Sequence, residues 1–174
     1  MGFRVLCGAL ALGSAGCSDD GLELFVDLKT DLVPDVEFVD VQVLLLGEGE
    51  FVETPAIGGF PFDEGQRVAE FDGLGANPTR GVRVVLLDAE RRTVAEREIV
   101  VQHTASRSVT LLVTRDCRDV TCPEGDTCYG GRCVDPGCVT GSEPECPEPE
   151  CERNLDCPNM DACAIARCES AVCV

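Results

Sequence analysis

Cysteine is the residue whose number and spacing suggest chemistry in this chain. Eleven of the thirteen cysteines follow residue 116. Ten of these form two sets of five, and corresponding members are 34 or 35 residues apart: Cys117, Cys122, Cys128, Cys133 and Cys138, then Cys151, Cys157, Cys163, Cys168 and Cys173. A register kept over five positions indicates a duplicated module. Cysteines this dense in such short segments predict disulfide bonds and an oxidising compartment, and reduction is expected to unfold this tail.

The cysteines leave their pairing open. Each module has five, and the eleventh, Cys146, lies alone between them. Cys146 completes one module, or the two odd cysteines bridge the copies, or one thiol stays free or pairs with a second molecule. Zinc is the alternative chemistry, but structural zinc sites favour closely spaced pairs such as Cys-x-x-Cys, and the sequence has none. We therefore predict disulfides, with no metal and no other cofactor.

Catalytic chemistry finds little support. His103 and Ser106, with Asp88 or Asp116 to orient the imidazole, are the best candidates for a nucleophile and its base. Residues so close together in a connecting loop rarely form the required relay. The sequence has no glycine-rich phosphate loop, no histidine-based metal set and no nucleophile-elbow serine. We expect no enzyme and no catalytic residues.

The first seventeen residues have the pattern of an export signal. Arg4 precedes an apolar run at residues 5–12, and small residues 14–16 lead to Cys17. This end resembles the lipobox of bacterial lipoproteins, and that resemblance implies removal of residues 1–16, acylation of Cys17 and attachment to a lipid bilayer, with residues 17–21 as a tether. The alternative is an ordinary signal peptide that is cleaved near Gly16. The expected location is the outer membrane or cell surface, or otherwise the periplasm or medium.

Residues 22–116 show the alternation of apolar and polar residues that is typical of half-buried strands. It is clearest at residues 22–28, 39–45 and 109–113. Residues 82–87 and 93–101 flank a turn that Asp88 opens, which predicts a hairpin, and residues 67–74 are a weaker strand. Short strands without a helical period predict an all-β fold, an antiparallel β-sandwich like those of immunoglobulin and fibronectin type III domains.

Residues 47–66 form a segment rich in glycine and proline that does not read as plain strand. Its apolar side chains include Phe51, Ile57, Phe60 and Phe62. Such residues either present a contact surface to a partner or fold inward to cap the sandwich or form a short edge strand. Both alternatives remain open from the sequence.

Small disulfide-rich modules with little regular secondary structure follow the sandwich, at residues 117–138 and 151–174, joined by an acidic, proline-rich linker at 139–150. In the first module, residues 122–133 read Cys-Pro-Glu-Gly-Asp-Thr-Cys-Tyr-Gly-Gly-Arg-Cys. This stretch resembles Dickkopf-like and EB-like cysteine-rich modules, and the whole chain resembles uncharacterised exported lipoproteins of myxobacteria. The resemblance implies an extracytoplasmic interaction or spacer module without catalytic residues.

The formal net charge of −18 excludes one class of partner. Phosphates would repel this surface, so no nucleic acid is expected. We expect a non-enzymatic exported lipoprotein with an interaction or structural role in the cell envelope or at the cell surface. The alternative is a secreted inhibitor-like or effector-like protein, in which Arg132 or Arg167 would enter a target's site.

Overall fold

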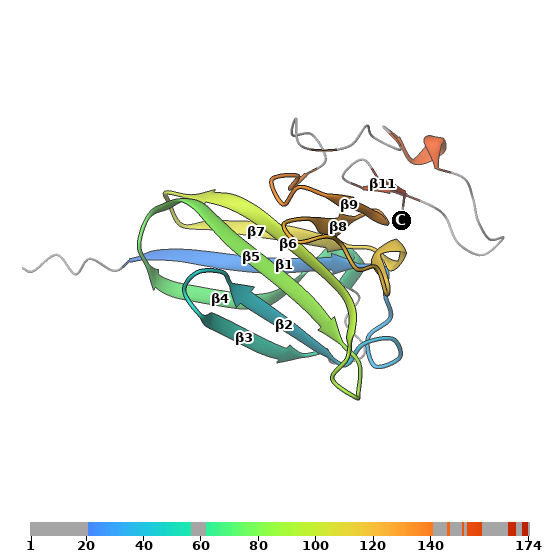
Figure 1. Cartoon of the computed structure of the whole chain (residues 1–174), viewed down its shortest axis with the longest axis horizontal. Helices are drawn as coiled ribbons and strands as arrows, with labels where there is room; N and C mark the ends of the chain where they lie inside the picture. The colour runs from blue at the N-terminus through green and yellow to red at the C-terminus, as the bar shows by residue number, and fades with distance from the viewer. Residues whose placement is uncertain are drawn as a thin grey trace, which may run out of the picture.

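Two β-sheets face each other in the first two thirds of the chain (Figure 1). The structure is a computed structural model that describes residues 21–56, 62–140, 146, 151, 153–157, 167–169 and 172–173. The strands of these sheets are β1 (Leu22–Thr30), β2 (Asp40–Leu45), β3 (Glu50–Pro55), β4 (Gln66–Leu74), β5 (Asn77–Leu87), β6 (Thr93–His103) and β7 (Arg107–Val113). One sheet has the order β4-β1-β7 and the other β3-β2-β5-β6. The predicted all-β sandwich is confirmed, and all its strand pairs are antiparallel except β1 and β7, which are parallel.

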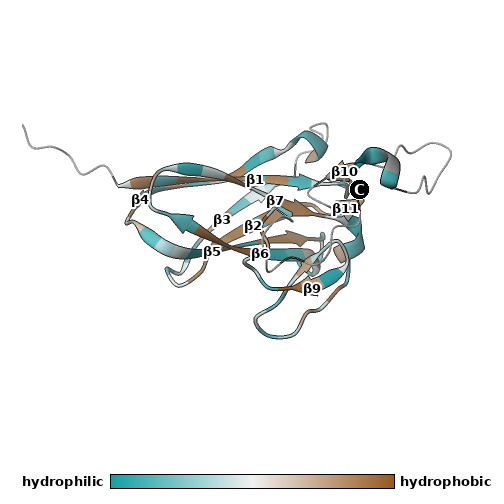
Figure 2. Cartoon of the chain, turned by 90° about the horizontal axis from the view of Figure 1, so that it is seen from above, coloured by the Kyte–Doolittle hydropathy of each residue, from teal (hydrophilic) through white to brown (hydrophobic). Residues whose placement is uncertain are grey.

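The alternation seen in the sequence is the alternation of burial in the strands. In β1 the even-numbered residues from Leu24 to Thr30 are buried, while their neighbours are partly exposed. In β2 the buried residues are Val41, Val43 and Leu45. These side chains meet between the two sheets and form most of one continuous apolar core. Figure 2 shows the brown, hydrophobic residues along the facing strands of the sandwich.

The predicted hairpin joins β5 to β6. The amide of Arg91 donates to the carbonyl of Asp88 over 2.9 Å, which closes the turn. The Asp88 carboxylate also accepts from the amides of Glu90 and Arg92, at 3.0 and 2.8 Å. An aspartate that binds the backbone in this way stabilises the turn without help from tertiary contacts.

The described residues of the segment at 47–66 follow the second alternative, in which the segment folds inward and forms a short edge strand. Phe62, at the start of the 3-10 helix η1 (Phe62–Glu64), is buried and meets the ring of Phe38 edge to face at 5.6 Å. Phe51, on the edge strand β3, is 62% exposed. Ile57 and Phe60 lie outside the described residues.

The first cysteine module begins at the 3-10 helix η2 (Arg115–Cys117) and contains a small hairpin of β8 (Thr127–Tyr129) and β9 (Arg132–Val134). Only Gly130 and Gly131 separate the two strands, and their φ angles are +54° and +76°. A two-residue turn with both φ angles positive is the tight hairpin turn that glycine permits at least cost. The hairpin thereby brings Cys128 opposite Cys133.

The second module has nearly the same cysteine spacing but a different disulfide pairing. Its described elements are the 3-10 helix η3 (Asn154–Asp156) and a short antiparallel pair, β10 (Cys168–Glu169) and β11 (Val172–Cys173). The five disulfides of the described residues are Cys117–Cys128, Cys122–Cys133, Cys138–Cys146, Cys151–Cys168 and Cys157–Cys173. In the first module the first cysteine bonds to the third, whereas in the second module it bonds to the fourth.

The turn residues account for this difference. At the positions that correspond to Gly130 and Gly131, the second module has Ile165 and Ala166, and side chains there disfavour positive φ. The hairpin of the second module instead joins its fourth and fifth cysteines, Cys168 and Cys173. The two modules therefore differ both in which cysteines face each other across the hairpin and in their disulfide pairing.

Candidate interaction site between the sandwich and the first cysteine module

The first cysteine module covers an open side of the sandwich, and Arg97 lies at the centre of this junction. In β6 the register pairs Arg97 with Val84, and Arg97 shares its face with Ala95 and Ile99. That face points into the sandwich, so Arg97 is fully buried. A buried guanidinium is costly unless its N–H groups find acceptors.

The acceptors of Arg97 come from two segments that are distant from it in the sequence. One terminal nitrogen donates to the carbonyl of Leu112 in β7 at 2.7 Å. The other donates to the carbonyls of Cys138 and Val139, both at 3.0 Å. The ring of Tyr129 stacks on the guanidinium, with its centroid 4.2 Å away. Arg97 thus ties together β6, β7 and the first module.

The module also satisfies the outer backbone edge of β6. The amide of Glu98 donates to the Thr127 hydroxyl at 2.6 Å, and the amide of Val100 donates to the carbonyl of Pro136 at 2.8 Å. Further along, the amide of Asp119 donates to the carbonyl of Val94 at 2.9 Å. Unpaired edge strands invite non-specific strand pairing. The module therefore protects this edge as a neighbouring strand would.

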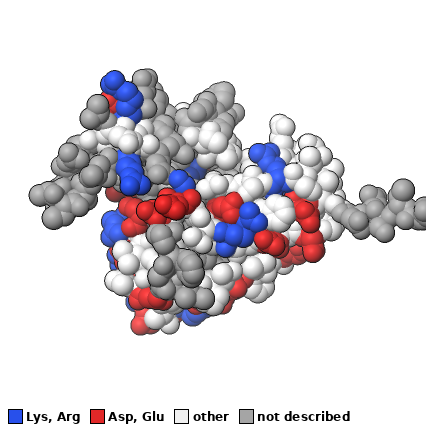
Figure 3. All heavy atoms as spheres, turned by 180° about the vertical axis from the view of Figure 1, so that it is seen from behind, with Lys and Arg blue, Asp and Glu red and all other residues white. Residues whose placement is uncertain are grey.

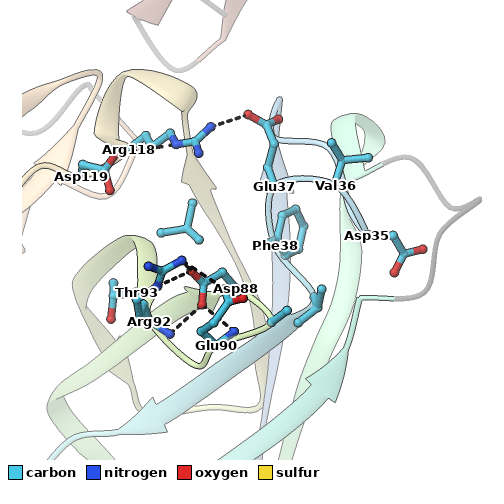
Figure 4. A pocket seen from close by; sticks show the side chains of 13 residues that line it. Asp35, Val36, Glu37, Phe38, Asp88, Glu90, Arg92, Thr93, Arg118 and Asp119 are labelled. Atoms are coloured by element: carbon cyan, nitrogen blue, oxygen red, sulfur yellow. Dashed lines mark hydrogen bonds and ion pairs between the residues drawn. The ribbon is translucent and has the colours of Figure 1, made fainter.

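The junction opens onto a cavity of about 500 Å³ at the end of the sandwich where the β5–β6 hairpin turns (Figure 4). Three segments line it: residues 35–39 from the β1–β2 connection, residues 88–90 and 92–94 from the hairpin, and residues 118–119 from the first module. Cavities of this size at a junction between structural units are common binding sites. We take this cavity as the candidate functional site.

Glu37 fixes one wall of the cavity. Its side chain is 10% exposed and forms ion pairs with Arg115 at 2.7 Å and Arg118 at 3.0 Å. It also accepts from the amide of Val33 at 2.8 Å, while the Glu37 amide donates back to the Val33 carbonyl. These contacts attach the β1–β2 connection to the start of the module.

Asp31 lies beside this wall. The pKa of its carboxyl is shifted upward, whereas that of Asp88 is shifted downward. Burial raises the pKa of the Asp31 carboxyl, although the amide of Arg115 donates to it at 2.6 Å. The amide and then the guanidinium of Arg92 hold the pKa of Asp88 below its ordinary value of 3.8. Asp88 is therefore ionised over the whole neutral and mildly acidic range.

The depressed pKa of Asp88 gives a testable pH dependence. Because the folded pKa is lower than the unfolded one, ionised Asp88 contributes stability that is present above pH 3.8 and is lost as pH falls through the folded value. We expect an NMR titration of its carboxyl carbon to have a midpoint below 3.8, and Arg92→Met to move it part of the way back, since the Arg92 amide stays in place. Glu53, whose pKa Arg91 lowers, is the internal control and should keep its midpoint in that variant. An unchanged Asp88 midpoint would contradict the assignment.

The catalytic candidates of the sequence do not come together. His103 is fully buried at the end of β6, with its Nε2 3.1 Å from the carbonyl of Glu23. Ser106 accepts from the Glu23 amide at 2.9 Å. Asp88 precedes the first residue of β6 and Asp116 follows the end of β7, so both lie at the opposite end of the sandwich from His103. The structure therefore shows no relay among these four residues.

Sulfur atoms of the second module gather in one place. The Sγ atoms of Cys151, Cys157 and Cys173 lie within 4.8 Å of one another. Each belongs to one of the two disulfides of that module, so they are not thiolate ligands for a metal. Cys17 and Cys163, predicted as the lipid anchor and as a module cysteine, lie outside the described residues.

Two arginines were candidates for an inhibitory contact. Arg132 begins β9 and is exposed, and its Cα pairs with that of Tyr129 across the tight turn. Arg167 is also exposed and directly precedes β10.

The disulfides indicate an exported protein, and among the described residues no helix is long and apolar enough to cross a membrane.

Sequence reasoning missed the residues that build the junction. Arg97 left a signal, because an arginine in the apolar phase of an alternating strand indicates a buried charge. Glu37, Arg115 and Arg118 left none, since each occurs in a polar context. Surface ion pairs are common in this protein, so charged residues alone do not mark the junction. Acidic side chains lie beside basic ones on the face shown in Figure 3, and ion pairs form at several other places.

Comparison of the chain with protein-family models, curated proteins and solved structures finds no match.

Proposed function

We propose that this protein is an exported, non-enzymatic lipoprotein, anchored through Cys17, with an interaction or structural role in the cell envelope or at the cell surface. The observation that carries the proposal is the position of the Cys117–Cys128 disulfide. Both cysteines belong to the apolar core of the sandwich, with 1% and 3% exposure. A fold whose main core contains a disulfide depends on an oxidising compartment.

The way in which the two parts are joined supports the proposed interaction role. The first module is held to the sandwich by a buried arginine, by hydrogen bonds of the β6 backbone and by a shared core. Together they present one surface with a cavity whose lining comes from both parts. A surface held in one conformation loses little conformational entropy when it binds.

The proposal is tested by intact-mass spectrometry of protein from the membranes and the medium of an export-competent bacterial host. We expect a membrane species that starts at Cys17, carries added acyl mass and loses its disulfides only on reduction. Cys17→Ser is the matched control and should move the protein out of the membrane fraction. A soluble wild-type species without acyl mass would overturn the anchor, and reduced cysteines in both modules would overturn the export.

A further inference from the structure

An apolar surface stands beside the junction cavity. Val36, on its rim, is 78% exposed, and Val33, three residues earlier, is 46% exposed. Figure 4 shows Val36 on the connection that also carries Glu37 and Phe38. Exposed valines add nothing to the core, and a rigid loop that displays them offers apolar contact area to another molecule.

The connection that carries these valines is held in one conformation. The amide of Asp35 donates to the carbonyl of Phe38 at 2.9 Å, and Phe38 itself is fully buried against Phe62. Asp35 has a φ of +63°, a conformation that is unfavourable for most L-residues but that aspartate and asparagine adopt more readily than others. The surface is therefore formed before any partner arrives.

The charge around the cavity selects the partner. On the module side, three carboxylates share two guanidinium groups: Asp31, Glu37 and Asp119 with Arg115 and Arg118. On the hairpin side, two carboxylates share one guanidinium group: Asp88 and Glu90 with Arg92. Each network has one carboxylate more than it has guanidinium groups.

The cavity lies between these two networks, and the outer carboxylates face solvent. The side chain of Asp119 is 81% exposed and that of Glu90 is 68% exposed. Asp35 adds a third negative charge on the rim and has no ion pair among the described residues. A cationic side chain in the cavity would meet unbalanced negative charge on both sides.

We propose that residues 33–37, the β5–β6 turn and residues 118–119 form a docking surface for a protein segment in which basic and apolar side chains alternate. Its basic side chains enter the cavity between Glu90 and Asp119, and its apolar side chains cover Val33 and Val36. The cavity has room for a few side chains of a peptide, whereas a basic surface without apolar residues would leave the valines exposed. This inference rests on the proposed interaction role and specifies the kind of partner.

Peptide titration of the oxidised full-length chain, followed by amide NMR, tests the proposal. The probes are three synthetic hexapeptides that alternate Lys with Val, Lys with Ser, and Glu with Val. We expect the Lys-Val peptide to shift the amides of residues 35–37, 88–93 and 118–119. The Lys-Ser peptide should bind at least fivefold more weakly, and the Glu-Val peptide should leave these amides unchanged.

Matched variants separate this surface from general attraction to an acidic protein. The test variant combines Asp35→Asn, Glu90→Gln and Asp119→Asn, and asparagine tolerates the positive φ of Asp35 and Asp119. The control variant removes the same charge from exposed residues of β4 and the segment before it: Glu64→Gln, Glu70→Gln and Asp72→Asn. We expect at least a tenfold loss of Lys-Val affinity in the test variant, and about the same fivefold loss from Val36→Ser as from the Lys-Ser peptide.

Three results would overturn the docking surface: equal losses in both charge variants, shifts confined to other residues, or no binding of the Lys-Val peptide. None of these depends on acylation or export. A membrane-attached, oxidised protein that fails this titration would keep the proposed location and lose only the docking surface.

Discussion

Replacing Arg97 by methionine is expected to lower the free energy of unfolding by about 3–5 kcal/mol. Methionine keeps much of the volume of the side chain but removes the donors to Leu112, Cys138 and Val139. A buried carbonyl that loses its donor costs roughly 1–3 kcal/mol, and these costs are not fully additive. The measurement is a chemical denaturation curve of the oxidised chain.

Arg83→Met is the matched control for this prediction. Arg83 lies on the neighbouring strand β5, on its outer face, where its side chain is 41% exposed and pairs with Glu98 at 2.7 Å. Exposed ion pairs contribute about 0–1 kcal/mol, so this variant should remain close to wild type. Equal losses of unfolding free energy in the two variants would show that buried Arg97 stabilises the fold no more than exposed Arg83 does.

A milder variant keeps the prediction testable if Arg97→Met does not fold. Tyr129→Leu removes the ring that stacks on Arg97 and leaves the hydrogen bonds of the guanidinium in place. A desolvated cation–π contact contributes up to about 2 kcal/mol. Hydrogen exchange should then accelerate at the amides of Glu98 and Val100, whose acceptors belong to the module. Unchanged exchange at these amides would contradict the role of Arg97 and Tyr129 in docking the module.

Removal of the Cys117–Cys128 disulfide by paired alanine substitutions is expected to destabilise the sandwich by about 2–5 kcal/mol. Both cysteines pack in its apolar core, and Cys117 follows directly from the end of β7. The loss should appear in the main unfolding transition of the chain, measured by the fluorescence of Tyr129 or by NMR of core valine methyl groups. Peptide mapping without reduction checks that the other disulfides still form.

The Cys151–Cys168 pair is the informative comparison. Its cysteines are 17 residues apart in the sequence, against 11 for Cys117 and Cys128. Loop-closure entropy alone would make the longer loop the more stabilising one, by a few tenths of a kcal/mol. Cys151 and Cys168 do not belong to the apolar core that the described residues form, so their removal should change the main transition by less than about 1 kcal/mol. The reverse ranking would show that loop length outweighs core packing here.

The sequence was sufficient where the physical cause is local. Alternation of apolar and polar residues identified the core faces of β1, β2 and β7 because side chains of a strand point to opposite sides in turn. Asp88 identified the hairpin turn because its carboxylate binds amides only two and four residues away. Cysteine density indicated the oxidising compartment because such short loops bury too little apolar surface to fold without crosslinks.

Contacts between distant segments were decided by the tertiary structure alone. The spacing of the cysteines is nearly identical in the two modules, yet their pairing differs, and only the sequence of the first module offers the two glycines of the Gly130-Gly131 turn. The cavity needs the β1–β2 connection, the hairpin and the start of the module at one end of the sandwich, which no short-range pattern encodes. Arg97 shows both limits together: its apolar strand position was a signal of burial that the sequence analysis missed, and its acceptors at Leu112, Cys138 and Val139 lie in segments that only the fold brings to it. Periodicity in the sequence indicates which face of a strand a side chain is on. Which groups it contacts there depends on how distant segments pack in the folded chain.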